Sequence, residues 1–236
     1  MTVRQRLGSS SPTMIPLATV VAAVWGTALV VAEPPAGFRE LFNGRDFDGW
    51  VIEGPPEGIT HPDGRPVWSV KDGEIVCQGK RWGFLRYERE TFGDFTLHVE
   101  FVLDRRGNSG IGLRTGPIDL ADPQNTRPSC YCYEIQLLDD AGKPPTEHSS
   151  GSLYRYVAPA ENAMRPAGEW NELEVTCIGP RIRVVLNGRP IQDFDQTSLA
   201  ATRDKPLAGH ICLQNHGHPV RFRNVWIRPE AEAAGK

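Results

Sequence analysis

The chain has 236 residues, a formal net charge of -3 and 39% hydrophobic residues, which suits one large domain with a sizeable core. Its 24 glycines and 20 prolines are typical of many short strands joined by turns. The basic residues form no patch, and this argues against a protein that binds nucleic acid.

The first 32 residues differ in character from the rest of the chain. Two arginines precede an uncharged run over residues 7–32 that is apolar from Met14 onward. A small-residue stretch at residues 30–32 has the composition of a cleavage site, so residues 1–32 are predicted to be a secretory signal peptide. The alternative is an uncleaved membrane anchor over residues 14–32, because a spanning helix needs roughly 20 apolar residues. We therefore expect a periplasmic, extracellular or membrane-anchored protein.

Strand and turn signals follow one another through the rest of the chain. Asp72-Gly73 and Asn187-Gly188 each lie between short apolar runs, a pattern typical of β-hairpins. Residues 94–103 and 170–178 alternate between apolar and polar side chains, as half-buried strands do. Strands of this kind at short spacing predict an all-β fold, a two-sheet antiparallel jelly-roll sandwich forming a single domain over residues 33–228. Residues 229–236 are expected to be a tail.

Residues 108–114 are predicted to form a central strand with one polar face. Ile111 and Leu113 point to the core, so Asn108, Arg114 and the two glycines between them line the opposite face. Glycines on a strand face remove bulk and let a ligand approach the backbone. This face is therefore the first candidate for a binding site.

Two further predicted strands add polar side chains to the same kind of face. Glu134 and Gln136 alternate with apolar residues in the first strand, and Gln214 and His216 do so in the second. These residue types bind hydroxyl groups and transfer protons. The alternative is an ordinary solvated face, but such a face usually carries Lys and Thr, which are missing from these strands. We therefore predict a functional site for a ligand rich in hydroxyl groups.

Three residues outside these strands are weaker candidates for sugar binding. Trp82 lies in a turn with glycine and arginine and is predicted to be a stacking platform. Tyr154 follows a Gly-Ser pair and could stack on a sugar ring or pack a loop. Arg223 lies on the last strand and could reach the same face or pair with outer-face acids.

The five cysteines do not indicate a metal site or a full set of disulfides. Their number is odd, so they cannot all pair within the chain. None is accompanied by histidines or cysteines at the spacing of zinc ligands. We expect small buried side chains, with one disulfide left open as an alternative.

Several short motifs occur in a fixed order along the chain. They are Leu41-Phe42-Asn43-Gly44, Gly107-Asn108-Ser109-Gly110-Ile111, Tyr133-Glu134-Ile135-Gln136, Gly168-Glu169-Trp170-Asn171, Leu186-Asn187-Gly188, Leu213-Gln214-Asn215-His216-Gly217 and Phe222-Arg223-Asn224-Val225. Over about residues 38–227 the chain resembles the 3-keto-disaccharide hydrolase family of the concanavalin-like lectin and glucanase superfamily. The resemblance implies a jelly roll, export, and action on glycosides whose sugar carries a ketone at carbon 3.

A ketone at that position makes a distinct route of cleavage available. It acidifies the hydrogen on carbon 2, so a base can remove that hydrogen and the enolate can expel the group at carbon 1. Water then adds to the enone. The route needs a base, a group that stabilises the enolate oxygen, and a proton donor for the leaving group.

The resemblance suggests roles for the residues of the polar face. His216 is the expected base because its ordinary pKa suits neutral pH, and Glu134 is the acid or the partner that orients His216. The alternative assignment exchanges the roles of Glu134 and His216. Arg114 is expected to hold the enolate oxygen, unless a divalent cation bound by Glu134 and His216 replaces it; no other cofactor is predicted. The expected hydroxyl ligands are Asn108, Gln136 and Gln214.

Two other functions remain open at this stage. A laminarinase-like retaining glycosidase needs Glu-x-Asp-x-x-Glu, where this chain has Glu134, Gln136 and Asp139. Its two carboxyls must also lie about 5–5.5 Å apart, which requires a bulge in the strand. A lectin-like carbohydrate-binding module needs only stacking rings and amides. In every case the expected partner is a carbohydrate, with no stable protein partner.

Overall fold

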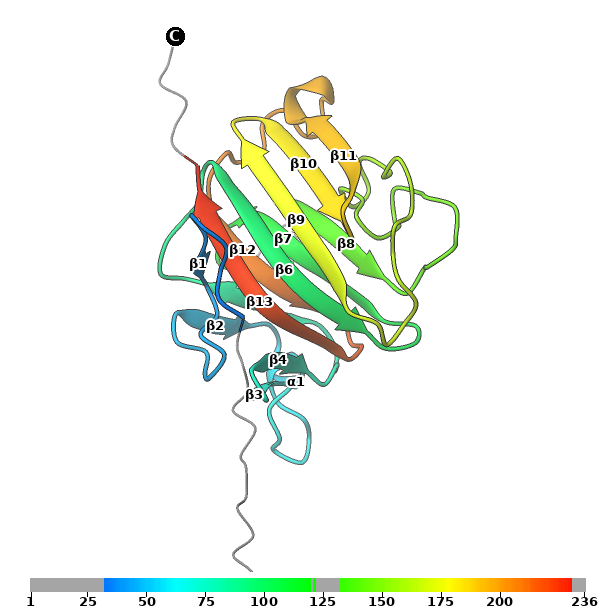
Figure 1. Cartoon of the computed structure of the whole chain (residues 1–236). Coiled ribbons are helices and arrows are strands. Elements are labelled where there is room, and N and C mark those ends of the chain that lie inside the picture. The colour runs from blue at the N-terminus through cyan, green and yellow to red at the C-terminus, as the bar shows by residue number, and fades with distance from the viewer. Residues whose placement is uncertain (1–31, 120, 122–131, 231–236) are drawn as a thin grey trace, which may run out of the picture.

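A computed structural model describes residues 32–119, 121 and 132–230 of the chain (Figure 1). These residues form thirteen strands, a single turn of α-helix and a short 3-10 helix. The predicted signal peptide or anchor lies outside the described residues, except for residue 32. Within the described part of the chain, no helix has the length and apolar character needed to cross a membrane.

The larger sheet has eight antiparallel strands and faces the viewer in Figure 1. Seven follow the order β11-β10-β9-β6-β13-β4-β3, and β1 pairs with β13. Their bounds are β1 Arg39–Glu40, β3 Trp68–Lys71, β4 Glu74–Cys77, β6 Phe95–Leu103, β9 Asn171–Ile178, β10 Arg181–Leu186, β11 Arg189–Asp195 and β13 Val220–Pro229.

The smaller sheet lies behind the larger one and has five strands in the order β2-β5-β12-β7-β8. Their bounds are β2 Trp50–Glu53, β5 Gly83–Tyr87, β7 Asn108–Thr115, β8 Tyr133–Leu138 and β12 His210–Asn215. The helical turns are α1 Pro56–Ile59 and η1 Gln196–Ser198. The expected all-β, two-sheet antiparallel sandwich is therefore confirmed.

The core fills the space between the two sheets. The inward side chains of β6, from Phe95 to Leu103 at every second position, are at most 1% exposed. Ile111 of β7, Ile135 of β8 and Leu213 of β12 face them from the smaller sheet and are completely buried. The alternation in the sequence therefore identified the core faces of these strands correctly, and their other faces point away from the core.

Both predicted hairpin turns are present. Asp72 and Gly73 have φ angles of 52° and 78° between β3 and β4, and Asn187 and Gly188 have 51° and 77° between β10 and β11. Two successive positive φ angles define the type I′ turn, which matches the twist of the strands it joins. The sequence predicted these turns because Asn, Asp and Gly tolerate that backbone conformation.

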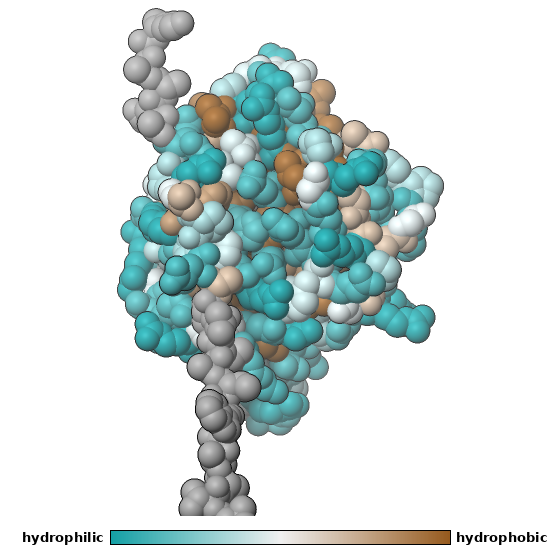
Figure 2. All heavy atoms as spheres, in the orientation of Figure 1, coloured by the Kyte–Doolittle hydropathy of each residue, from teal (hydrophilic) through white to brown (hydrophobic). Residues whose placement is uncertain are grey.

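The last strand runs slightly further than expected. β13 ends at Pro229, and the Glu230 backbone nitrogen donates to the Asp94 carbonyl at 3.0 Å. The predicted tail therefore begins later than residue 229. The face of the molecule shown in Figure 2 is mostly hydrophilic, with separate apolar spots, as expected for a sandwich whose apolar side chains lie between the sheets.

Candidate functional site

The outward face of the smaller sheet brings together three of the predicted site residues. The pairing of β12 with β7 sets Gln214 opposite Gly110, and Gly110 pairs in turn with Gln136 of β8. Glu134 lies two residues before Gln136 and points to the same face. Glu134, Gln136 and Gln214 are each only 4% exposed. The smaller sheet thus carries a buried polar face opposite its core face.

The Glu134 carboxylate is fixed in the middle of this face. Its Oε1 atom accepts a hydrogen bond from Nε2 of Gln214 at 2.9 Å. The bond spans β7, and the glycine at position 110 makes room for it. A Cβ atom at Gly110 would lie 2.5 Å from Oε1 and 2.8 Å from Cγ of Glu134. The carboxylate therefore lies directly over the backbone of Gly110.

Two amides beside Glu134 are available for a ligand with hydroxyl groups. The Gln214 side-chain oxygen is buried and makes no hydrogen bond with the described residues. A buried acceptor without a donor is uncommon and calls for an explanation, such as a ligand hydroxyl or a water. Gln136 Nε2 donates to Oδ1 of Asn108 at 3.2 Å, which brings the predicted hydroxyl ligands Asn108 and Gln136 into contact.

His216 and Trp82 lie at the exposed end of the same face. His216 follows β12 directly, is exposed, and stacks on His218 with ring centroids 6.5 Å apart. The strand register, continued one residue past Asn215, sets His216 between Trp82 and Asn108. Trp82 is half-buried. The structure therefore brings His216 and Trp82 to the edge of the site rather than to its buried centre.

Tyr154 lies at the other edge of the smaller sheet, next to β8. Its backbone nitrogen donates to the carbonyl of Glu134 at 2.9 Å, so the two residues are neighbours across the edge. Its ring is half-buried and meets the ring of His148 edge-on, with centroids 5.2 Å apart. Tyr154 is therefore positioned beside the polar face, and its role in stacking on a sugar ring stays a prediction.

Arg114 does not lie on the polar face, and that prediction is wrong. The residue has a φ angle of 54° where the register of β7 and β12 shifts, and this bulge turns its side chain into the sandwich. The guanidinium is fully buried and donates to the carbonyls of Gly93 and Gly179, with the shortest contact to each at 2.8 Å. Asp94 lies 3.7 Å away. Arg114 thus links the smaller sheet to the ends of β6 and β9 in the larger one.

Arg223 is also remote from the site. It belongs to β13 of the larger sheet, where its Nε atom donates to Glu100 at 2.7 Å. Its guanidinium carbon lies 4.0 Å from the ring centroid of Trp170. The two sheets pack through their inner faces, so this outer surface is on the far side of the molecule from Glu134. The alternative role, pairing with an outer-face acid, is the one observed.

A buried ion pair that the sequence analysis missed lies on the polar face. Arg86 of β5 pairs in register with Cys212 and donates through Nε and Nη2 to one oxygen of Glu53, at 3.0 and 2.8 Å. The two side chains are 7% and 15% exposed. A signal was available, because Arg86 is a charged residue within an otherwise apolar run. Arg86 supplies this face with the guanidinium that Arg114 does not.

The Cys212 thiol lies near the Glu134 carboxylate and near the ion pair of Arg86 with Glu53. Burial raises its pKa well above the usual value, and the neighbouring Cys132, Glu134 and Glu53 raise it further. A protonated thiol is a poor nucleophile, so Cys212 is a structural residue here. The cysteines at positions 77, 132, 177 and 212 are buried, and no disulfide joins any two of them; Cys130 lies outside the described residues.

The hypothesis of a bound cation is not supported by a cluster of ligands. In residues 32–119, 121 and 132–230, no three histidine, cysteine or carboxylate side chains converge as metal ligands would. A divalent cation held by Glu134 and His216 therefore stays a hypothesis.

The geometry of β8 argues against a laminarinase-like site. β7 and β8 pair without any shift in register, from the pair of Asn108 with Leu138 to the pair of Leu113 with Tyr133. Glu134 and Asp139 therefore lack the bulge that would bring their carboxyls together. Five residues of extended strand span about 16 Å, against the 5–5.5 Å that retention needs. Asp139 instead accepts a hydrogen bond from the backbone of Arg106 at 2.7 Å.

The fold alone does not identify the function, and comparison with known proteins gives the family of the chain. The model of the 3-keto-alpha-glucoside-1,2-lyase-like domain matches residues 37–228. The chain belongs to this family, so the resemblance to 3-keto-disaccharide hydrolases is confirmed. No match was found among curated proteins.

Several solved structures are similar to this chain. A Parabacteroides distasonis protein proposed to be a glycosyl hydrolase is 26% identical, with a TM-score of 0.67 over 83% of this chain and 94% of that one. A second protein from the same organism with the same description is 24% identical, with a TM-score of 0.63 over 82% and 99%. The exoplasmic/lumenal domain of VIP36, solved with Ca²⁺ and Man3GlcNAc, is 9% identical with a TM-score of 0.53 over 82% and 90%. The last two likenesses show the fold alone.

Proposed function

We propose that this protein cleaves glycosides whose sugar carries a ketone at carbon 3, by eliminating the group at carbon 1. The family description and the polar face of the smaller sheet support the proposal. In the first step a base takes the proton from carbon 2, and the electron pair forms the enolate. The enolate then re-forms the ketone and a carbon 1–carbon 2 double bond, while the carbon 1–oxygen bond breaks. Addition of water to the enone gives net hydrolysis.

The observation that carries the proposal is the fixed position of the Glu134 carboxylate. Gln214 holds it over Gly110, inside a buried face where Phe84 of β5 is the neighbour of Gln214 on the other side. A base held in place before the substrate binds avoids much of the entropic cost of reaction. Glu134 is therefore the proposed acceptor of the carbon 2 proton, one of the two role assignments that the sequence left open.

His216 is the proposed donor of a proton to the leaving group. It lies at the exposed end of the face, where an aglycone can leave toward solvent. Histidine is the side chain that most often donates and accepts protons in catalysis. Trp82 beside it offers an aromatic surface for the sugar or the aglycone.

Arg86 is the proposed group that stabilises the enolate oxygen. It shares the polar face with Glu134, and its ion pair with Glu53 holds the guanidinium in one orientation. A fixed cation at a developing negative charge is typically one of the largest contributions to catalysis. The hydroxyl ligands in this scheme are Asn108, Gln136 and the free oxygen of Gln214, with Tyr154 at the edge.

The proposal also includes export of the protein from the cytoplasm. Residues 1–32 are proposed to direct the protein to the periplasm or the outside of the cell, where glycosides are encountered; anchoring by residues 14–32 is the alternative. Detection of a mature N-terminus near Glu33 on the exported protein supports cleavage. Retention of residues 1–32 in the membrane fraction contradicts it.

Two leaving groups test the assigned roles. With 4-nitrophenyl 3-keto-α-glucoside the leaving group needs little help from an acid, whereas with methyl 3-keto-α-glucoside it does. Glu134→Gln is expected to lower turnover of both substrates about 10²–10⁴-fold. His216→Ala is expected to slow the methyl glycoside much more than the nitrophenyl glycoside. Equal losses on both substrates for His216→Ala contradict the role of His216. Sugar binding without turnover by the wild type supports a lectin-like module instead.

A further inference from the structure

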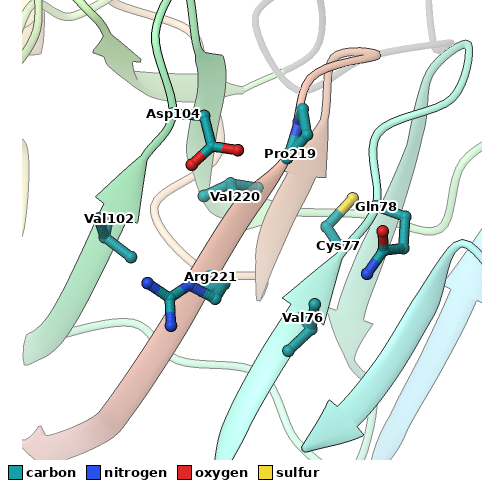
Figure 3. A pocket seen from close by; sticks show the side chains of 8 residues that line it. All are labelled: Val76, Cys77, Gln78, Val102, Asp104, Pro219, Val220 and Arg221. Carbon is teal, nitrogen blue, oxygen red and sulfur yellow. The ribbon is translucent and has the colours of Figure 1, made fainter. Parts of the chain in front are cut away.

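A pocket of about 210 Å³ opens on the outer surface of the larger sheet, on the opposite side of the sandwich from Glu134 (Figure 3). It lies where β4 and β6 end and β13 begins. In Figure 3 the β13 residues lie between β6 side chains on one side and β4 side chains on the other. None of its lining residues belongs to the polar face described above.

The lining of the pocket combines apolar and polar side chains. Arg221 of β13 pairs with Val76 of β4 and with Val102 of β6, so the two valines flank it on the outward face. Pro219 lines the pocket at the start of β13. These side chains offer contacts for the C–H groups of a ligand.

Two polar side chains at the rim have no partner among the described residues. The Asp104 carboxylate follows β6, and the Gln78 amide follows β4; both are exposed and line the pocket. Neither side chain takes part in a hydrogen bond or ion pair with the rest of the described chain. They can therefore bind a ligand without first breaking a contact within the protein.

The third polar group, the guanidinium of Arg221, is held in place from two sides. Its Nη1 atom donates to Glu74 at 2.9 Å. Its carbon Cζ lies 5.3 Å from the ring centroid of Trp170. An arginine fixed by an ion pair and an aromatic ring loses little freedom when it also donates to a ligand. The pocket thus combines one fixed donor with a free carboxylate and a free amide.

We propose that this pocket binds one ring of a neutral saccharide. Arg221 is already paired with Glu74, so it does not need the negative charge of an anionic ligand to balance it. A neutral ligand with several hydroxyl groups can donate to Asp104 and accept from Arg221. The pocket is smaller than the roughly 300–1,000 Å³ that drug-sized ligands occupy, which suits a single sugar ring. Such a site holds the protein on a glycan and does not depend on the proposed reaction.

The proposal is tested by NMR titration of the ¹⁵N-labelled wild-type protein with methyl α-glucoside, methyl β-glucoside and methyl α-mannoside. At least one of these is expected to shift the Gln78 side-chain amide and the backbone amides of Asp104 and Val220. The shifts are expected to saturate with a dissociation constant on the order of a few millimolar. Absence of shifts at these three positions with all three glycosides overturns the proposal.

A matched pair of variants separates this site from the polar face. Asp104→Ala removes a charge-assisted hydrogen bond and is expected to weaken the titration about tenfold or more. Asp204→Ala removes another exposed carboxylate and is expected to change nothing. Turnover of a 3-keto-α-glucoside is expected to be the same in both variants. Unchanged binding in Asp104→Ala, or shifts confined to Gln214 and its neighbours, contradicts the proposed site.

Discussion

Replacing Gly110 with alanine tests the geometry of the site at a single atom. The new Cβ would lie 2.5 Å from Oε1 and 2.9 Å from Cδ of Glu134, closer than non-bonded atoms can approach. The backbone of Gly110 does not have a positive φ angle, so alanine is tolerated there without strain. The carboxylate is the part that can move, and we expect it to be pushed away from Gln214.

We expect Gly110→Ala to lower both the free energy of unfolding and kcat. The hydrogen bond between Gln214 and the carboxylate contributes about 1.5–3 kcal/mol, and alanine returns roughly 0.4–1 kcal/mol by restricting the unfolded chain. The net loss of about 1–2 kcal/mol corresponds to a melting temperature roughly 2–8 °C lower for a domain of this size. Moving a catalytic group by about 1 Å costs on the order of 10²-fold in rate, which sets the expected fall in kcat.

The assay pairs thermal unfolding with turnover of 4-nitrophenyl 3-keto-α-glucoside. Gly93→Ala is the matched control, because a Cβ there meets only ordinary contacts at 3.8 and 4.0 Å. It is expected to leave both kcat and the melting temperature close to those of the wild type. Wild-type kcat in Gly110→Ala would refute the assignment of Glu134 as a fixed catalytic group.

Three further predictions follow from other parts of the structure. Arg114→Met removes the buried link between the sheets and should lower the free energy of unfolding by about 3–5 kcal/mol, as measured by urea denaturation; unchanged stability with lost turnover would contradict its structural role. Arg223 lies on the far side of the molecule from Glu134, so Arg223→Ala should leave kcat/KM unchanged. A tenfold loss of kcat/KM would be inconsistent with that position. Burial lowers the pKa of His98 below 6.5 in the folded state, so the unfolded chain binds its proton first as the pH falls. Stability should therefore fall below about pH 6.5 in the wild type and fall less in His98→Phe, as measured by denaturation at several pH values.

The fold could be predicted from the sequence because its signals are local. Alternation over residues 94–103 identifies one buried face whatever strand lies beside it. Asn187-Gly188 similarly specifies a turn through the conformations that its two residues tolerate. The grouping of Glu134, Gln136 and Gln214 also followed from alternation, once their strands were assumed to share a sheet.

The errors arose where the outcome depends on pairing between distant strands. Alternation predicts that Arg114 lies on the polar face. A bulge where β7 pairs with β12 turns its side chain the other way, and the sequence of β7 does not predict this bulge. Arg223 was left with two roles, the polar face or an ion pair with an outer-face acid, because the sequence does not say to which sheet its strand belongs. Arg86 was missed for the same reason, since β5 joins the site only through its pairing with β12.

The most direct test of the account is release of the aglycone from 4-nitrophenyl 3-keto-α-glucoside and from its unoxidised parent, 4-nitrophenyl α-glucoside. We expect release from the keto-glycoside alone, and a loss of at least about 10²-fold in Glu134→Gln. Equal release from both substrates, or full activity in Glu134→Gln, would contradict elimination assisted by the ketone.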